Sequence, residues 1–334
     1  MKKFFIVALT VVFFGVLMPE PVSAANKVVI KLASLIPENT PWGVALKRMA
    51  SEWSRATNGE VELQIYHNGV VGGEEDCLRK LKSNQIQGAV FTSMGLSLIT
   101  PEIMTLSVPF LLKDDTELDF VLDAIGADLE VRIIKQGFFP VAWAKSGWVQ
   151  FFSKSPVWSP ADLRKLKVAT APESPKLTDT FKSMGFQLVP ANQNDMMIFL
   201  SSNKIEALYS SPMAMAASQL FAMAKNMASL NIAPFMGAVI FNQRAWRAIP
   251  DQYKPRLLEI ADSVEKEISL SVAQLEADAV RTMVSYGLIV NQVSPAQEQQ
   301  WIDEVNRAMP SLLGSVFDRD LYTKITAILQ SYRK

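Results

Sequence analysis

The sequence predicts an α/β fold of two lobes that face each other across a cleft, with a long helix bracing both. Strand-like and helix-like patterns alternate in the order βαβαβ, and this order occurs twice. The segment 83–90 is echoed 119 residues later by 202–209. The stretch 256–286 contains neither Gly nor Pro and would measure roughly 46 Å as one straight helix. That length exceeds the width of one lobe of this size.

Composition narrows the function classes. The 334 residues allow roughly two domains, and the 33 basic residues balance the 33 acidic ones. This balance argues against electrostatic binding to nucleic acid or to an anionic membrane. The single Cys excludes a disulfide framework, an iron–sulfur site and a zinc knuckle. Any Ser–His or Cys–His mechanism would depend on His67, the only histidine.

Residues 1–24 have the pattern of a signal peptide. Lys2 and Lys3 precede an apolar run over 4–18, and small residues occupy 22–24. The run is short for a bilayer span of about 20 residues, although an uncleaved anchor is the alternative. We expect cleavage after Ala24 and a soluble periplasmic protein.

The first lobe is expected over 25–145. Thr40 followed by Pro41 predicts a helix start, and Asn58-Gly59 predicts its end. Strand patterns occur at 28–33, 61–65 and 86–91, and a second helix pattern covers 74–83.

The second lobe is expected over 146–240. Its strand patterns lie at 166–169, 186–189 and within 202–209, and its helix patterns lie at 175–184 and 195–200. A helical region spanning both lobes is expected over 241–334. The final helix is predicted to start at Ser294, where Gln297 completes a capping box.

The strand ends predict where a ligand would lie. In open α/β sheets, ligands bind beyond the carboxyl ends of the strands. The rule selects four loops, at 34–40, 92–96, 170–174 and 210–215. Met213 and Met215 fall in the last of these, and flexible, polarizable Met suits an adaptable apolar pocket, although core packing explains most of the other methionines.

Signs of catalysis or metal binding are weak. Nucleophile-elbow, P-loop, dinucleotide, HExxH and CxxC motifs are missing from the sequence. The acids at 74–76 fit a helix N-terminus better than a metal site, and those at 114–115 fit a helix cap. His67 beside Asn68-Gly69 fits a loop, and Cys77 fits a buried thiol. We therefore expect no enzyme, cofactor or metal.

Several segments resemble one protein family in order along the chain. They are LASLIPENTPWG at 32–43, TNGEV at 57–61, NGVVGGE at 68–74, PFL at 109–111, DLRKLKV at 162–168 and FNQRAWRAIP at 241–250. The sequence is similar to the DctP-type solute receptors of tripartite ATP-independent periplasmic (TRAP) transporters. The resemblance implies a two-lobed, periplasmic-binding-protein-like fold that closes on a small solute and delivers it to a membrane permease. Some relatives also work with a tetratricopeptide-repeat accessory protein.

The chain departs from the family pattern at two positions. The family usually has an arginine after the motif at 162–168, where it pairs with a substrate carboxylate; this sequence has Ala169 there. A second family arginine corresponds to Val149, which follows Gly147-Trp148. The departures argue for a ligand that is apolar or weakly polar. The residues expected to line the site are Trp42, Met94, Phe110, Trp148, Ala169, Tyr209, Ser211 and Met213.

Two rival functions stay open at this point. A periplasmic shuttle or chaperone for lipids or other hydrophobic ligands would need no permease. An exported hydrolase would depend on His67.

Overall fold

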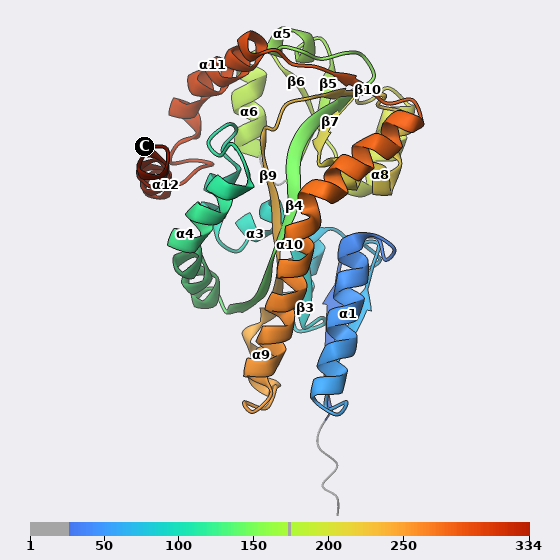
Figure 1. Ribbon diagram of the computed structural model, residues 1–334, viewed down its shortest axis with the longest axis vertical. Coiled ribbons are helices and arrows are strands. Elements are labelled where there is room, and N and C mark those ends of the chain that lie inside the picture. The colour runs from blue at the N-terminus through green and yellow to red at the C-terminus, as the bar shows by residue number, and fades with distance from the viewer. Residues whose placement is uncertain (1–26, 173–174) are drawn as a thin grey trace, which may run out of the picture.

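The computed structural model describes residues 27–172 and 175–334, which form a mixed α/β molecule with a central sheet (Figure 1). The strand order is β2-β1-β3-β9-β4-β7-β5-β6, with β8 joining β4 to β10. The strands are β1 (Val28–Ala33), β2 (Val61–Tyr66), β3 (Gly88–Thr92), β4 (Phe138–Ser153), β5 (Lys167–Thr170), β6 (Gln187–Pro190), β7 (Ala207–Ser210), β8 (Asn226–Ala228), β9 (Ala233–Asn242) and β10 (Ile289–Asn291).

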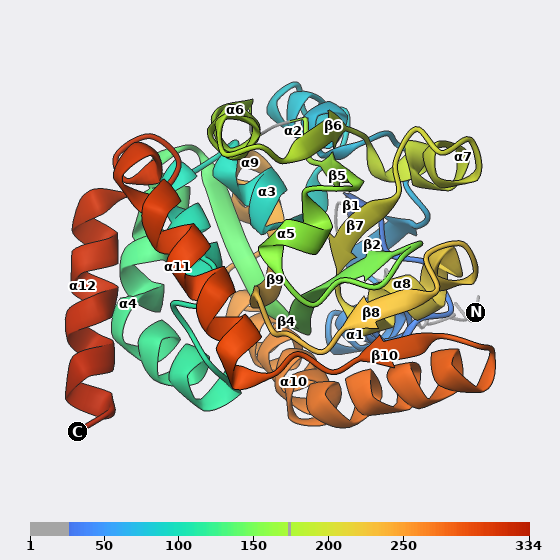
Figure 2. The same cartoon turned by 90° about the horizontal axis from the view of Figure 1, so that it is seen from above.

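Helices cover both faces of this sheet (Figures 1 and 2). They are α1 (Pro41–Ala56), α2 (Glu74–Lys82), α3 (Ser93–Ser97), α4 (Asp115–Lys135), α5 (Pro160–Leu163), α6 (Pro175–Ser183), α7 (Met196–Ser201), α8 (Pro212–Ser218), α9 (Gln243–Ala248), α10 (Lys254–Ser285), α11 (Pro295–Leu312) and α12 (Arg319–Tyr332), with short 3₁₀ turns η1 (Pro101–Ser107), η2 (Gln193–Asp195) and η3 (Leu220–Ala222). The α/β prediction with two lobes is confirmed.

Several elements of lobe I begin where the sequence predicts them. The Thr40 hydroxyl accepts a hydrogen bond from Gly43 N and begins α1. The inner face of α1 buries Trp53, whose Nε1 donates to Leu257 O of α10 at 3.0 Å. β1 pairs in parallel with β2 and β3, as expected for strands joined by crossover helices.

The repeat is visible as matching backbone geometry. Asn84 and Asn203 both adopt left-handed conformations, with φ of 58° and 56°, ahead of β3 and β7. Thr92, the last residue of β3, and Ser211, directly after β7, are the N-caps of α3 and α8. The corresponding strands of the two lobes therefore both lead into a capped helix.

Two long strands, β4 and β9, connect the lobes and were not predicted. They pair antiparallel with each other, so the sheet is mixed rather than purely parallel. Their pairing shifts between Lys145 and Trp148, where Gly147 has a φ of +83°. The expected boundary at 145/146 lies within this irregularity of β4. β9 is almost entirely buried, and β4 mixes buried and half-buried residues without regular alternation, so neither shows the pattern of a half-exposed strand.

The long helix is present as α10, which contacts α1 of lobe I and α8 of lobe II. The Ser294–Gln297 capping box begins α11 as predicted. However, α11 is not the last helix, which is a correction to the expectation. Asp318 caps a further helix, α12, which packs against α4 (Figure 2).

Within the described residues, no helix is both long and apolar enough to cross a membrane. The expected signal peptide, residues 1–24, lies outside the described residues.

Candidate functional site

A cavity of about 270 Å³ opens where strand ends of both lobes meet helices α6 and α11. This volume is near the lower end for small-molecule pockets. The lining residues are Thr92, Ser93, Met94, Met104, Ser107, Pro109, Phe110, Val149, Phe151, Leu163, Val168, Ala169, Thr170, Leu177, Phe181, Phe186, Leu188, Tyr209, Ser210, Ile232, Ala233, Pro234, Phe235, Trp301, Glu304, Val305 and Phe317.

Lobe I contributes the end of β3. Glu74, on the first turn of α2, accepts hydrogen bonds from the Thr92 backbone N and, at 2.9 Å, from the Thr92 hydroxyl. Thr92 then caps α3 and directs Met94 to the cavity. Glu74 is thus a positioning residue of the strand end, a role that the reading of 74–76 as a helix terminus did not include.

Lobe II contributes the ends of β5 and β7. Ala169 is 1% exposed and lies at the cavity wall, followed by Thr170. The Thr170 and Thr178 hydroxyls share a 3.1 Å hydrogen bond, which ties the strand end to α6. Tyr209 and Ser210 supply further polar atoms from β7.

Phe110 adopts an unusual backbone conformation at the cavity. Its φ is +61°, a left-handed value that is strained for a large side chain. Its backbone N donates to Ile232 O at 2.8 Å, next to the start of β9. The surrounding chain therefore holds Phe110 in a strained conformation at this cavity.

The described lining of the cavity offers no cation to an anionic ligand. Among the described residues that line it, none is Lys, Arg or His. Its one acidic residue, Glu304, is 3% exposed and pairs with Arg164 and Arg307. The two positions where relatives are expected to carry arginines, Val149 and Ala169, both line this cavity.

Four of the eight expected site residues line the cavity, namely Met94, Phe110, Ala169 and Tyr209. The other four do not, and two of them have evident structural contacts. Trp148 lies on the opposite face of β4 from Val149 and donates from Nε1 to Asp115 Oδ1 at 3.1 Å. The Ser211 hydroxyl caps α8 by accepting from Ala214 N at 3.3 Å.

Trp42 and Met213 are the remaining two. Trp42 packs on the lobe I core, and its Nε1 has no hydrogen-bond partner among the described residues. Met213 is half-buried on the first turn of α8. Contact of any of the eight residues with a ligand stays a prediction.

Sequence reasoning missed the cavity wall formed by α6 and α11. Phe181, Trp301 and Val305 belong to amphipathic helices, whose apolar faces the sequence can identify. Which neighbour those faces meet depends on contacts distant in sequence, so no local signal could have assigned them to a site.

The catalytic and metal alternatives gain no support from geometry. Burial raises the pKa of the Cys77 thiol to about 11, which keeps the sulfur protonated and unreactive near neutral pH. His67 Nδ1 lies 3.3 Å from Ile36 O at a loop outside the cavity. The described part of the chain contains no group of three or more His, Cys, Asp or Glu side chains placed to hold a metal ion.

Comparison with known proteins assigns the family. The family model for bacterial extracellular solute-binding proteins, family 7 (DctP), matches residues 32–313, most of the chain. The chain belongs to this family. The DctP-type resemblance inferred from the sequence motifs is confirmed.

Individual relatives of this DctP-family protein are distant. A solute-binding protein of Verminephrobacter eiseniae is 27% identical over 55% of both chains, so the match spans about half of that relative's length. The C4-dicarboxylate-binding periplasmic protein DctP of Vibrio cholerae is 21% identical over 84% of this chain and 86% of its own.

The fold agrees with solved structures. A TRAP periplasmic solute-binding protein from Sulfurospirillum deleyianum, with bound succinate, superposes with a TM-score of 0.83. It is 21% identical, and the match covers 90% of this chain and 98% of that one. At this identity the likeness establishes the two-lobed fold.

Proposed function

We propose that this protein is the solute-binding receptor of a TRAP transporter, and that it captures a small ligand between its lobes for delivery to a membrane permease. Family membership supports the receptor role. The position of the cavity, lined by the ends of β3 in one lobe and of β5 and β7 in the other, supports ligand-driven closure. The pattern of residues 1–24 supports export to the periplasm.

The proposed ligand is apolar or weakly polar. The observation that carries this proposal is the convergence of Val149 and Ala169 in one cavity whose described lining contains no Lys or Arg. The Vibrio cholerae relative is named for C4-dicarboxylates and the Sulfurospirillum deleyianum structure holds succinate, so the proposed ligand class separates this protein from those two. Burying a carboxylate without a cation costs several kcal/mol, and a neutral ligand avoids that cost.

The ligand class is tested by native purification followed by mass spectrometry of the extracted small molecules. Calorimetry then compares the identified compound with succinate. We expect an uncharged compound to bind and succinate to show no binding at millimolar concentration. Micromolar binding of succinate would contradict the ligand class while leaving the receptor role in place.

The receptor role is tested by uptake of the identified compound in cells with and without the cognate permease. Uptake that requires both the receptor and the permease is expected. Transfer of the compound to membranes that lack the permease would favour a periplasmic shuttle, for which the apolar cavity is equally suitable.

A further inference from the structure

Part of the cavity wall, called the far end, belongs mostly to α5, α6 and α11, and the residues at the strand ends form the near end. At this far end its walls are Leu163 of α5, Phe181 of α6, Phe186, and Trp301 and Val305 of α11, together with Phe317. These six residues, called the tail subsite below, present only hydrocarbon and aromatic surface except for the indole N–H. The near end, in contrast, carries the hydroxyls of Thr92, Ser93, Thr170 and Ser210.

The aromatic walls of the tail subsite are fixed by their own contacts. The Phe181 and Phe186 rings meet edge to face, with centroids 5.7 Å apart. Trp301 stacks on Phe151 at 5.1 Å, and its Nε1 donates to Trp158 O at 3.1 Å. Because the indole N–H already has an acceptor, Trp301 offers a ligand its apolar ring.

The charged side chains at this end form ion pairs with one another. Glu304 pairs with Arg164 and Arg307. The Arg164 guanidinium also lies over the Phe186 ring at 4.6 Å, and its Nε donates to Met184 O at 3.0 Å. This network anchors α11 to lobe II and leaves Arg164 poorly placed to pair with a ligand.

We propose that the tail subsite holds an alkyl or aryl tail of the ligand, whose uncharged polar end stays beside the hydroxyls at the strand ends. The ligand class is thus a neutral amphiphile such as an alcohol or an amide. The cavity volume allows on the order of ten non-hydrogen atoms if each occupies the ~30 Å³ of a water molecule. The inference rests on the proposed receptor function and assigns the chemistry of its ligand.

The test uses protein freed of bound ligand and the alcohol series butanol, hexanol and octanol, with binding of each alcohol measured directly by isothermal titration calorimetry. Each methylene buried in the tail subsite should tighten binding about fourfold, the ratio that corresponds to ~0.8 kcal/mol per buried CH₂. Equal affinities across the series would overturn the proposal.

Two variants of one position locate the tail. Val305→Phe should shorten the subsite and weaken octanol at least tenfold while leaving butanol within about twofold. Val305→Ala should lengthen the subsite and improve decanol relative to octanol; this variant provides the test if the larger side chain prevents folding. Val280→Phe is the matched control, since Val280 packs in a lobe II cluster and does not line the cavity.

A change at the near end should act differently. Thr170→Val should weaken every alcohol by a similar factor and leave the increment per methylene unchanged. If Val305→Phe weakens butanol as much as octanol, the tail lies elsewhere and the proposal is wrong. A permease-independent uptake result would overturn the receptor function and would leave the chain-length dependence intact, so the two failures are distinguishable.

Discussion

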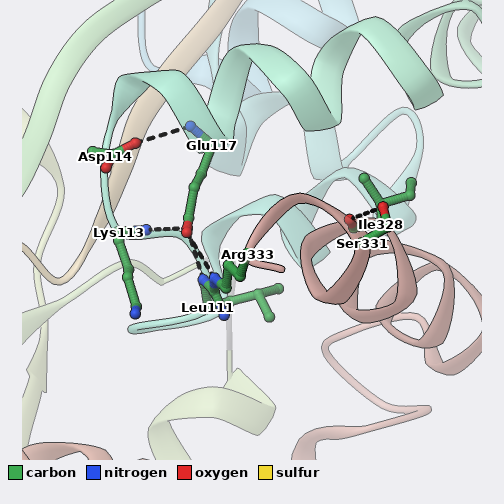
Figure 3. Close-up of polar contacts among 7 residues, drawn as sticks. All are labelled: Leu111, Lys113, Asp114, Glu117, Ile328, Ser331 and Arg333. Carbon is green, nitrogen blue, oxygen red and sulfur yellow. Dashed lines mark hydrogen bonds and ion pairs between the residues drawn. The ribbon is translucent and has the colours of Figure 1, made fainter.

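Two glutamates, the buried Glu117 on α4 and the half-buried Glu276 on α10, experience opposite environments. Glu117 is 4% exposed and accepts from Arg333 Nε and Nη2, each at 2.7 Å, and from Lys113 N at 2.9 Å (Figure 3). The Arg333 hydrogen bonds lower the pKa of Glu117 despite burial. Among the described residues, the Glu276 carboxylate accepts only from Trp148 N, at 3.2 Å. Burial, reinforced by the nearby charge of Asp115, raises the pKa of Glu276 to about 8.

The difference shows what a cation contributes in this protein. Glu117, which pairs with Arg333, is ionised at neutral pH, whereas Glu276, whose pKa is about 8, is mostly protonated. No Lys, Arg or His occurs among the described residues that line the cavity, and the carboxylate of its lining residue Glu304 is paired with Arg164 and Arg307. The comparison with Glu276 therefore supports the proposed neutral ligand, because a ligand carboxylate would need a cation of its own.

Among the substitutions proposed here, Glu276→Gln should change the free energy of unfolding most. The pKa of Glu276 is raised from 4.5 to about 8, so the folded state holds a proton that the unfolded state has lost between these values. This group therefore makes the wild type less stable as pH rises through the window. Relative to wild type, the variant should gain on the order of 4 kcal/mol between pH 5 and pH 8 in urea unfolding.

The control for that comparison is Glu259→Gln, on the same helix but in an exposed pair with Arg256. Its stability difference from wild type should vary little across the same pH range. A Glu276→Gln difference that is equally flat would show that Glu276 is ionised in the folded protein.

Arg333→Met should reverse the situation of Glu117 by leaving its buried carboxylate without a cation. Loss of one partner of a buried ion pair is strongly destabilising, and partial exposure of Arg333 moderates the effect to about 3 kcal/mol. Urea unfolding at pH 7 measures it. Arg281→Met, which breaks an exposed pair with Asp278, should cost less than ~1 kcal/mol.

Ala169→Arg should test the cavity by adding the cation that it lacks. A neutral ligand could not pair with the guanidinium, so its affinity should fall about thirtyfold, or ~2 kcal/mol. We expect no gain of carboxylate binding from this change alone, because a binding arginine must also be held in place by its neighbours. Calorimetry with the co-purified compound and with succinate decides this, and unchanged affinity would place Ala169 outside the binding site.

The smallest expected effect is on the free energy of unfolding at acidic pH. Because the pKa of Glu117 is lowered in the folded state, its stabilisation is present above the unfolded value of 4.5 and is lost as pH falls through the folded pKa. The wild type should therefore lose about 1 kcal/mol more than Arg333→Met between pH 5 and pH 3. Parallel acid profiles for the two proteins would contradict the ion-pair interpretation.

Prediction from sequence succeeded where a signal lies within a few residues. The Thr40-Pro41 start of α1 and the Ser294–Gln297 capping box were identified because cap and helix are neighbours in the chain. It failed for β4 and β9, which show no regular alternation of buried and exposed residues. It also missed α12, the helix that follows α11. Trp148, expected at the site, donates from Nε1 to Asp115, and its contact with a ligand stays a prediction.

The sequence by itself determined the βαβαβ repeat, the caps at the strand ends and the missing cations at Val149 and Ala169, since periodicity and residue identity need no distant partner. Only the tertiary structure decided that these two positions share one cavity and that α11 closes its far end. The tertiary structure also brings the Glu276 side chain close to Gly147. A Cβ atom at position 147 would lie only 1.9 Å from the Glu276 carboxyl carbon. The physical reason is that burial and charge pairing arise between segments far apart along the chain, whereas caps and periodicity arise within one or two turns.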